Sequence, residues 1–163
     1  MKLKSTRSKI VTKSEAKKIA SSLHRKGKKI VFTNGCFDLL HIGHVTYLEK
    51  AARLGDVLFV GIDTDSAVRG QKGPTRPINP LRARSGVLAG LEAVTYVVSF
   101  SKSNPISLIE AIKPDVLVKG GDWKASQILG AKEVLGSGGK VKSIPIVAGF
   151  STTRLISKSQ GKK

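Results

Sequence analysis

Short apolar runs alternate with amphipathic segments along this chain of 163 residues, and few folds accommodate that order. The apolar runs read KIVFTNG, DVLFVGI, TYVVSF, DVLVKGG and VKSIPIV. Strands that are separated by helices pair in parallel, because each helix returns the chain to the same end of the sheet. The sequence therefore predicts an α/β fold, a single doubly wound domain with a five-stranded parallel sheet.

Helices are expected between and around these strands. Thr12 and Glu15 have the spacing of a capping box, which predicts a basic helix that runs to about Arg25 and ends at Gly27. A last helix is expected to begin near Ser151. The remaining helices are expected near residues 44–54, 81–91, 105–112 and 126–134.

The length and the apolar content of 40% support one hydrophobic core. We predict three segments: a basic helical extension over residues 1–29, the α/β domain over residues 30–156, and a basic tail over residues 157–163. The sequence contains neither an apolar run of about 18 residues nor the apolar stretch of a secretory signal. The single cysteine, Cys36, cannot form an internal disulfide. We therefore expect a cytoplasmic protein without a membrane partner.

The net charge of +18 lies mainly at the two ends of the chain. Residues 1–29 hold eleven Lys or Arg and one acid, and residues 154–163 hold four more basic residues and no acid, whereas residues 30–153 hold fourteen basic and ten acidic residues. Such ends are typical of solvated tails, and no zinc-finger or aromatic RNA-binding motif accompanies them. We expect nonspecific polyanion contacts at low salt and no specific nucleic acid partner, with a basic nucleic-acid-binding protein as an alternative.

Polar residues follow four of the five predicted strands. The segments after the first, second, fourth and fifth strands read GCFDLLHIGH, DTDSAVRGQKGPTRP, KGGDW and GFSTTR. Ligands of doubly wound sheets gather outside the carboxyl ends of the strands, near the point where the strand order reverses. These four segments are therefore predicted to form one site.

The residue types in this site suit phosphate groups. Gly43 lets a phosphate approach the backbone at a helix start, where His41 and His44 can donate from the same turn. Ser151 to Thr153 repeat the arrangement at a second helix start. More negative charge could be neutralised by Lys72, Arg76 and Arg84. We predict a triphosphate site in which catalysis depends on positioning and charge stabilisation.

The motifs also resemble a known family. GCFDLLHIGH and STTRLI resemble the HxGH and ISTT-like motifs of the nucleotidylyltransferase superfamily, over about Ile30 to Ile156. With KGPTRPINPLRAR, LEAVTYVVSF and PDVLVKGGDW, the chain is similar to the heptose 1-phosphate adenylyltransferases, without the sugar-kinase domain fused to many of them. HxGH alone is only moderately specific, whereas five linked motifs in order are a strong signal. The resemblance implies a Rossmann-like fold.

The resemblance implies that a sugar 1-phosphate attacks the α-phosphorus of ATP with Mg²⁺ present, giving an ADP-sugar and pyrophosphate for surface glycans such as lipopolysaccharide. It also implies a homodimer. The implied catalytic residues are His41, His44 and Lys72. The nucleotide would be bound by Asn34, Gly35, Cys36, Phe37, His41, Gly43, His44, Arg84, Lys119, Gly120, Gly121, Asp122, Ser151, Thr152 and Thr153. The sugar phosphate would be bound by Asp38, Asp63, Asp65, Lys72, Arg76 and Trp123, and no residue is expected to be a dedicated metal ligand.

A cytidylyltransferase that acts on a small alcohol phosphate, such as glycerol 3-phosphate, is the nearest alternative. Cys36 stands where cytidylyltransferases usually have threonine, and the segment before Ser151 lacks the arginine that they carry there. Both departures favour ATP over CTP as the expected nucleotide.

Overall fold

The computed structural model describes residues 5–101 and 104–161, so that residues 1–4 and 162–163 of the predicted basic ends lie outside it. Five parallel strands form one sheet in the order β3-β2-β1-β4-β5, which confirms the predicted fold class. The strands are β1 Ile30–Gly35, β2 Val57–Asp63, β3 Tyr96–Phe100, β4 Val116–Gly120 and β5 Lys140–Ile144. The order reverses between β1 and β4, so a crevice opens at their carboxyl ends.

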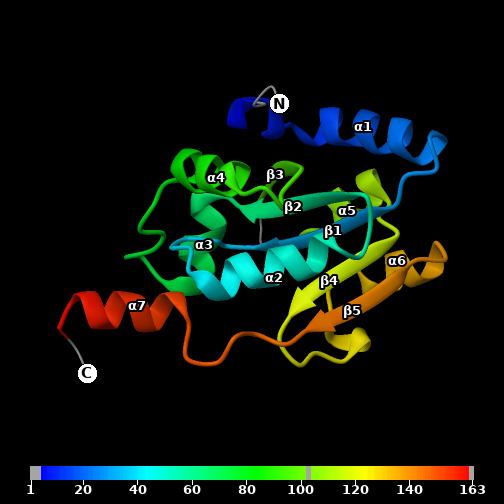
Figure 1. The fold of residues 1–163 in the computed structure, drawn as a ribbon. Coiled ribbons are helices and arrows are strands. Elements are labelled where there is room, and N and C mark those ends of the chain that lie inside the picture. The colour runs from blue at the N-terminus through cyan, green and yellow to red at the C-terminus, as the bar shows by residue number, and fades with distance from the viewer. Residues whose placement is uncertain (1–4, 102–103, 162–163) are drawn as a thin grey trace.

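Two layers of helices cover the sheet (Figure 1). In the described chain, the helices are η1 Thr6–Lys9, α1 Lys13–Arg25, α2 Ile42–Ala52, α3 Asp65–Lys72, α4 Leu81–Gly90, α5 Ile106–Ile112, η2 Ala125–Gln127, α6 Ala131–Gly136 and α7 Thr152–Ser159. One core cluster joins α1, α5 and α6 to one face of the sheet, and a second joins α2 and α4 to the other. This division follows from right-handed crossovers on either side of β1.

The alternation of side chains along each strand assigns residues to the two faces. Phe32 of β1 and Leu117 of β4 belong to the cluster with α1 and α5, whereas their neighbours Val31 and Val118 belong to the cluster with α2. Since side chains alternate along a strand, residues two positions further on lie on the same face as their counterparts. This rule decides which polar residues share a face where the strands end.

Three predicted boundaries differ from the structure. The helices expected from the sequence include none directly after β2, whereas the structure has α3 there, which Thr64 caps by accepting from the backbone of Ala67 (3.4 Å). The helix expected near 126–134 is divided into η2 and α6 at Gly130, whose φ of +88° and close contact with Ile109 exclude a Cβ. The strand β5 stops at Ile144, because Pro145 cannot donate to the ladder.

The predicted N-terminal extension packs on the domain. The capping box of Thr12 and Glu15 is present, and Ala16 and Ala20 of α1 are buried in the core. The Nζ of Lys9 donates to the carbonyl oxygens of Leu91 (3.1 Å) and Val94 (2.8 Å). The segment boundary predicted at residue 29 stays a prediction.

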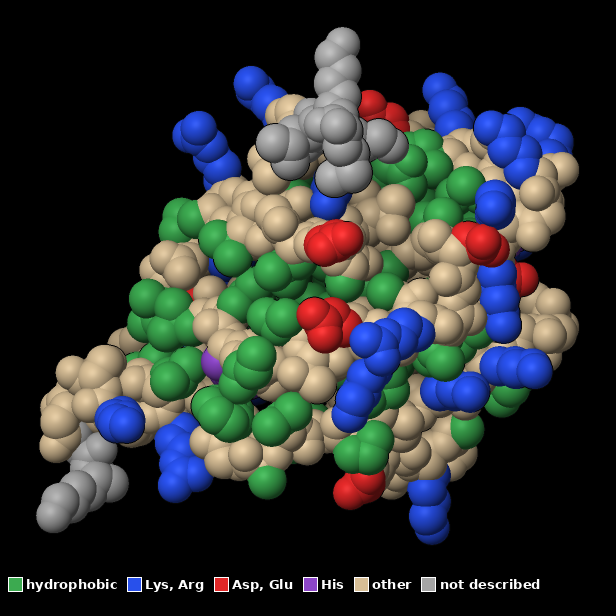
Figure 2. All heavy atoms as spheres, in the orientation of Figure 1, with side chains coloured by type: hydrophobic (Ala, Val, Ile, Leu, Met, Phe, Trp, Pro, Cys, Tyr) green, Lys and Arg blue, Asp and Glu red, His purple; other side chains and the backbone are tan. Residues whose placement is uncertain are grey.

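Basic side chains are spread over the face shown in Figure 2, and hydrophobic side chains fill much of its middle. Among the described residues, no helix is both long enough and apolar enough to span a membrane.

Candidate active site

A cavity of about 600 Å³ opens at the carboxyl ends of the strands. It brings together most of the predicted site residues: Asn34, Gly35, Cys36, Phe37, Asp38, His41, Gly43, His44, Asp63, Lys72, Arg76, Lys119, Gly120, Trp123, Ser151, Thr152 and Thr153. Four predicted residues do not line it: Asp65, Arg84, Gly121 and Asp122. The segments that follow β1, β2, β4 and β5 thus converge, as the topology requires.

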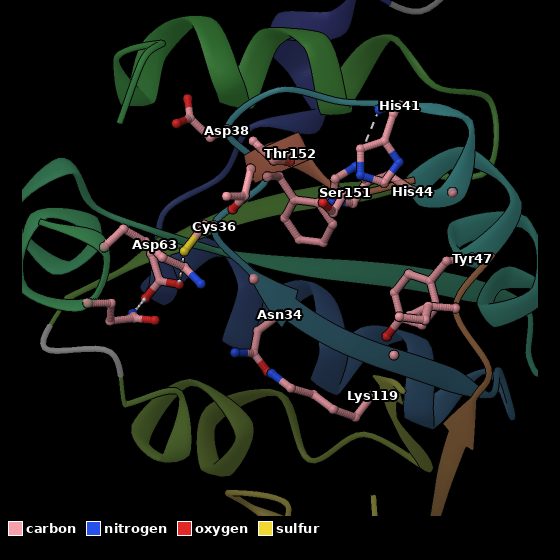
Figure 3. A pocket seen from close by; sticks show the side chains of 18 of the residues that line it. Asn34, Cys36, Asp38, His41, His44, Tyr47, Asp63, Lys119, Ser151 and Thr152 are labelled. Carbon is pink, nitrogen blue, oxygen red and sulfur yellow. Dashed lines mark hydrogen bonds between the residues drawn. The ribbon is translucent and has the colours of Figure 1, made fainter. Parts of the chain in front are cut away.

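The rings of the two histidines lie against each other at the start of α2, with centroids 3.9 Å apart and their planes tilted by 33° (Figure 3). The backbone N–H of His41 donates to Nδ1 of His44 (3.3 Å), which leaves Nε2 as the donor of the neutral His44 ring. Burial and the neighbouring His41 lower the pKa of His44 to about 4, and burial lowers the pKa of His41. Both rings are therefore neutral hydrogen-bond donors near pH 7.

The ring of His41 lacks one of its possible hydrogen bonds. Its Nδ1 is buried and has no hydrogen-bond partner among the residues that the structure describes. A Cβ at Gly43 would lie 2.9 Å from both Nδ1 and Cε1 of His41, so the glycine makes room for this ring. A buried ring nitrogen without a partner, beside a helix N-terminus, is suited to a ligand that supplies the missing hydrogen bond.

The second helix start comes from α7. Ser151 caps it by accepting from the backbone of Arg154 (3.1 Å), and the hydroxyl of Thr152 donates to the carbonyl oxygen of Leu39 (2.9 Å). The ring of Phe150 stacks with that of His41 at 6.3 Å between centroids. These contacts place the N-terminus of α7 beside the histidine turn, so two positive helix ends face one cavity.

Asp38 organises the loop that precedes α4. It is 4% exposed and accepts from the Nε of Arg76 (2.7 Å) and from the backbone of Ile78 (2.8 Å) and Asn79 (2.9 Å). Burial alone would raise the pKa of Asp38, but these three donors together hold it below its ordinary value. Asp38 and Arg76 line the cavity as predicted, and each is already bonded to the other.

Arg84 and Asp65 lie behind the cavity wall. Arg84 is 1% exposed and donates to the carbonyl oxygens of Cys36 (2.7 Å) and Asn79 (2.9 Å) and to Oδ1 of Asp65 (2.7 Å). Asp65 also accepts from the backbone of Leu81 (2.8 Å). In the structure both residues stabilise the turn after β1. The nucleotide contact predicted for Arg84 and the substrate contact predicted for Asp65 stay predictions. Buried guanidinium groups need such partners, and Arg84 finds them in the turn after β1, in the loop before α4 and at the start of α3.

The turn after β4 places only part of its sequence in the site. Gly120 and Trp123 line the cavity, and the indole Nε1 of Trp123 donates to the carbonyl oxygen of Gly120 (2.9 Å). Asp122 is exposed, and Gly121 turns the chain with a φ of +106°. The contacts predicted for these two residues with the nucleotide stay predictions.

A polar cluster occupies the strand ends away from the histidines. Asp63 accepts from the thiol of Cys36 (3.6 Å) and from the amide of Gln71 (3.3 Å). Burial raises the pKa of Asp63 and of the Cys36 thiol, and burial lowers the pKa of Lys119. The attraction of Asp63 works against that decrease. Cys36 is therefore a neutral hydrogen-bond donor in this site.

Eight residues that line the cavity were absent from the predicted set: Tyr47, Gln71, Gln127, Ile128, Leu129, Ile146, Val147 and Phe150. Tyr47 could have been found from its position one turn after His44, and Phe150 from its place beside the hydroxyl cluster. Gln127 to Leu129, at the end of η2 and just after it, carried no signal, because their approach depends on how the chain folds back after β4.

These features define a class: an α/β nucleotide-binding protein with a paired-histidine turn at the strand-order reversal. A family model described as cytidylyltransferase-like matches residues 32–158, and the chain belongs to this family of nucleotidyltransferases.

Curated relatives are identical to this chain at about half of the aligned residues. The chain is 50% identical over 151 residues to the "Bifunctional protein HldE" of Haemophilus ducreyi. The aligned residues cover 93% of this chain and 32% of that protein. The chain is 54% identical over 136 residues to the protein of the same name from Vibrio vulnificus strain YJ016, covering 83% and 29% of the two chains. The chain thus spans about a third of the length of these relatives.

Solved structures share the fold. The "lipopolysaccharide core biosynthesis protein" of Thermoplasma volcanium superposes with a TM-score of 0.60 at 28% identity, covering 74% of this chain and 98% of that one. A pantoate-beta-alanine ligase from Francisella tularensis, solved in complex with beta-gamma ATP and beta-alanine, has the same TM-score at 18% identity over 93% and 76% of the chains. The second likeness concerns the fold alone.

Proposed function

We propose that the chain transfers AMP from ATP to D-glycero-D-manno-heptose 1-phosphate, giving ADP-heptose and pyrophosphate for lipopolysaccharide or another surface glycan. The observation that carries this proposal is the cavity between the N-termini of α2 and α7, where neutral histidines and hydroxyls can bind a triphosphate. The identity of about 50% with HldE proteins supports the choice of sugar phosphate.

In the proposed reaction, a phosphate oxygen of the sugar 1-phosphate forms a bond to the α-phosphorus of ATP. The bond from that phosphorus to the oxygen bridging to the β-phosphate breaks, and pyrophosphate leaves. His41 and His44 donate to phosphate oxygens as negative charge develops on the leaving group, and Lys72 adds positive charge at the cavity mouth. Fixed donors of this kind contribute on the order of a hundredfold or more each to the rate.

Mg²⁺ belongs to this proposal as the partner of the triphosphate, because it commonly binds through substrate phosphates and needs few protein ligands. Among the described residues there is no cluster of three or more His, Cys, Asp or Glu that could hold a metal. When bound, the ion neutralises part of the charge of the triphosphate.

The test crosses ATP and CTP with heptose 1-phosphate and glycerol 3-phosphate and measures pyrophosphate release. We expect MgATP with heptose 1-phosphate to be the best pair, with CTP at least tenfold poorer in kcat/KM, since one unmatched buried polar group costs about 1–3 kcal/mol. Equal or better turnover of CTP with glycerol 3-phosphate would establish the cytidylyltransferase alternative. The implied homodimer is a separate proposal that light scattering in solution tests.

A further inference from the structure

The cavity extends over both faces of the sheet. Asn34 and Lys119 follow Phe32 and Leu117 by two positions, and Asp63 follows Phe59 by four, so all three lie on the face covered by α1 and α5. The histidine turn belongs to α2 on the opposite face. Figure 3 shows Asn34 and Lys119 on the side of the cavity away from His41 and His44.

Lys119 provides a positive charge on the side of the cavity that belongs to the α1 and α5 face. Its side chain lines the cavity, and its ammonium group makes no hydrogen bond or ion pair with any residue in the described part of the chain. The other basic residues that line the cavity differ from it: Arg76 is paired with Asp38, and Lys72 is exposed. A half-buried ammonium that donates no hydrogen bond is costly, and an anionic ligand that accepts from it removes that cost.

The reaction brings two anions together, a triphosphate and the phosphate of the acceptor. The helix N-termini and the histidines serve one of them on the α2 face. We propose that Lys119 binds the phosphate of the acceptor on the opposite face, and that Asp63, which shares that face, is a positioning residue whose negative charge keeps the ammonium group protonated. This inference rests on the proposed function and moves Lys119 from the nucleotide, where the sequence analysis put it, to the acceptor.

Substitution of Lys119 tests the inference through the KM values of the two substrates. With ATP saturating, Lys119→Gln is expected to raise the KM for heptose 1-phosphate at least tenfold, while the KM for ATP changes less than twofold. Lys119→Arg keeps the charge and is expected to recover part of the loss. Lys142→Gln on β5 is the matched control, because this lysine is exposed and outside the cavity.

Asp63→Asn tests the positioning role through pH. The other charged or titratable groups that act on this pair are Cys36 and Arg84, and the substitution leaves both residues unchanged. Without the attraction of Asp63, Lys119 loses its proton at lower pH, so the acceptor KM is expected to begin its alkaline rise at lower pH than in the parent protein. An unchanged profile would refute the positioning role.

Phosphate binding separates this inference from the proposed function. Inorganic phosphate, titrated calorimetrically with α,β-methylene-ATP bound, is expected to bind the parent protein and Lys142→Gln equally and Lys119→Gln at least tenfold more weakly. Equal binding to all three proteins, or a matching rise in the KM for ATP, would overturn the assignment of Lys119. Failure of the parent protein to release pyrophosphate with heptose 1-phosphate, together with weakened phosphate binding by Lys119→Gln, would overturn the choice of reaction and support the anion site.

Discussion

The two helices whose N-termini face the cavity are held in very different ways. α2 buries Gly43, Tyr47, Leu48 and Ala51 against the sheet, and the hydroxyl of Tyr47 is 2.6 Å from that of Thr33. No residue of α7 is buried. Figure 1 shows α7 at the edge of the molecule, reached by a long segment after β5.

This difference in burial distinguishes the hydrogen-bond donors of α2 from those of α7, although both sets stand at helix starts in the sequence. Donors on α2 are fixed by the core before any ligand binds, so their energy is available to the transition state. Donors on α7 depend on a few local contacts, chiefly the Thr152 hydroxyl and the ring of Phe150. We expect changes on the α2 side to affect kcat or stability strongly and changes on α7 to affect nucleotide affinity modestly.

His44→Ala should have the largest effect, because it removes a preorganised donor from the anchored helix. We expect kcat to fall by about two to three orders of magnitude with a native circular dichroism spectrum. His24→Ala on α1, outside the cavity, is the control and should keep full activity. A decrease of less than about tenfold in kcat for His44→Ala would remove the histidine from the mechanism.

Arg84→Met should have the next largest effect, on the free energy of unfolding. The substitution removes the guanidinium donor from the carbonyl oxygens of Cys36 and Asn79 and leaves the carboxylate of Asp65 with only the backbone N–H of Leu81. We expect a loss of about 2–4 kcal/mol in urea unfolding, whereas Arg82→Met on the exposed side of α4 should change stability by less than about 0.5 kcal/mol. A higher KM for ATP with unchanged stability would instead support the nucleotide contact predicted from the sequence.

Arg84 shows which parts of the structure could be predicted from the sequence and which could not. The alternation of strands and helices predicted the sheet, and the strand ends predicted which segments would meet. The sequence could not reveal the partners of Arg84, because two of them are backbone carbonyl oxygens and the third lies on α3. That short polar helix was overlooked: its eight residues bury only Ala67 and Val68, too few for a helical pattern to stand out.

The polar cluster at the strand ends was predicted only in part: most of its residues were identified, but not that they lie together. Asp63 and Lys119 were identified as candidates because each stands where a parallel strand ends. Their shared face follows from strand alternation, but the sequence alone did not establish which strands are neighbours. The order of the strands brings β2 and β4 to either side of β1, and only then do the two side chains become parts of one cluster.

Thr152→Val tests the weaker attachment of α7. It removes the hydrogen bond to Leu39 with little change in side-chain volume, and a single such bond is worth about 1 kcal/mol. We expect the KM for ATP to rise about three- to tenfold and the melting temperature to shift by no more than about 2 °C. Ser159→Ala, at the opposite end of α7, should leave both unchanged. A large loss of stability would show that α7 is anchored as firmly as α2.

The smallest expected effect is the pH dependence of stability that His44 contributes. Its pKa is about 4 in the folded protein and ordinarily 6.5, so the unfolded chain takes up the proton first as the pH falls. Stability is therefore fully retained above pH 6.5 and decreases between pH 6.5 and 4. Between pH 7 and 5, we expect the parent protein to lose on the order of 1 kcal/mol relative to His44→Gln, after allowance for partial exposure of the ring.

Urea unfolding of both proteins at pH 7, 6 and 5 measures this difference. His41 and Asp63 are present in both proteins, so to first order their own titrations cancel in the comparison. Asp38, whose pKa is lowered, loses its contribution only below its ordinary value of 3.8, outside this range. A constant difference in unfolding free energy from pH 7 to 5 would mean that the His44 ring accepts a proton as readily in the folded protein as in the unfolded chain. The α2 turn would then be more open to water than its burial indicates, and the contrast with α7 would lose its electrostatic basis.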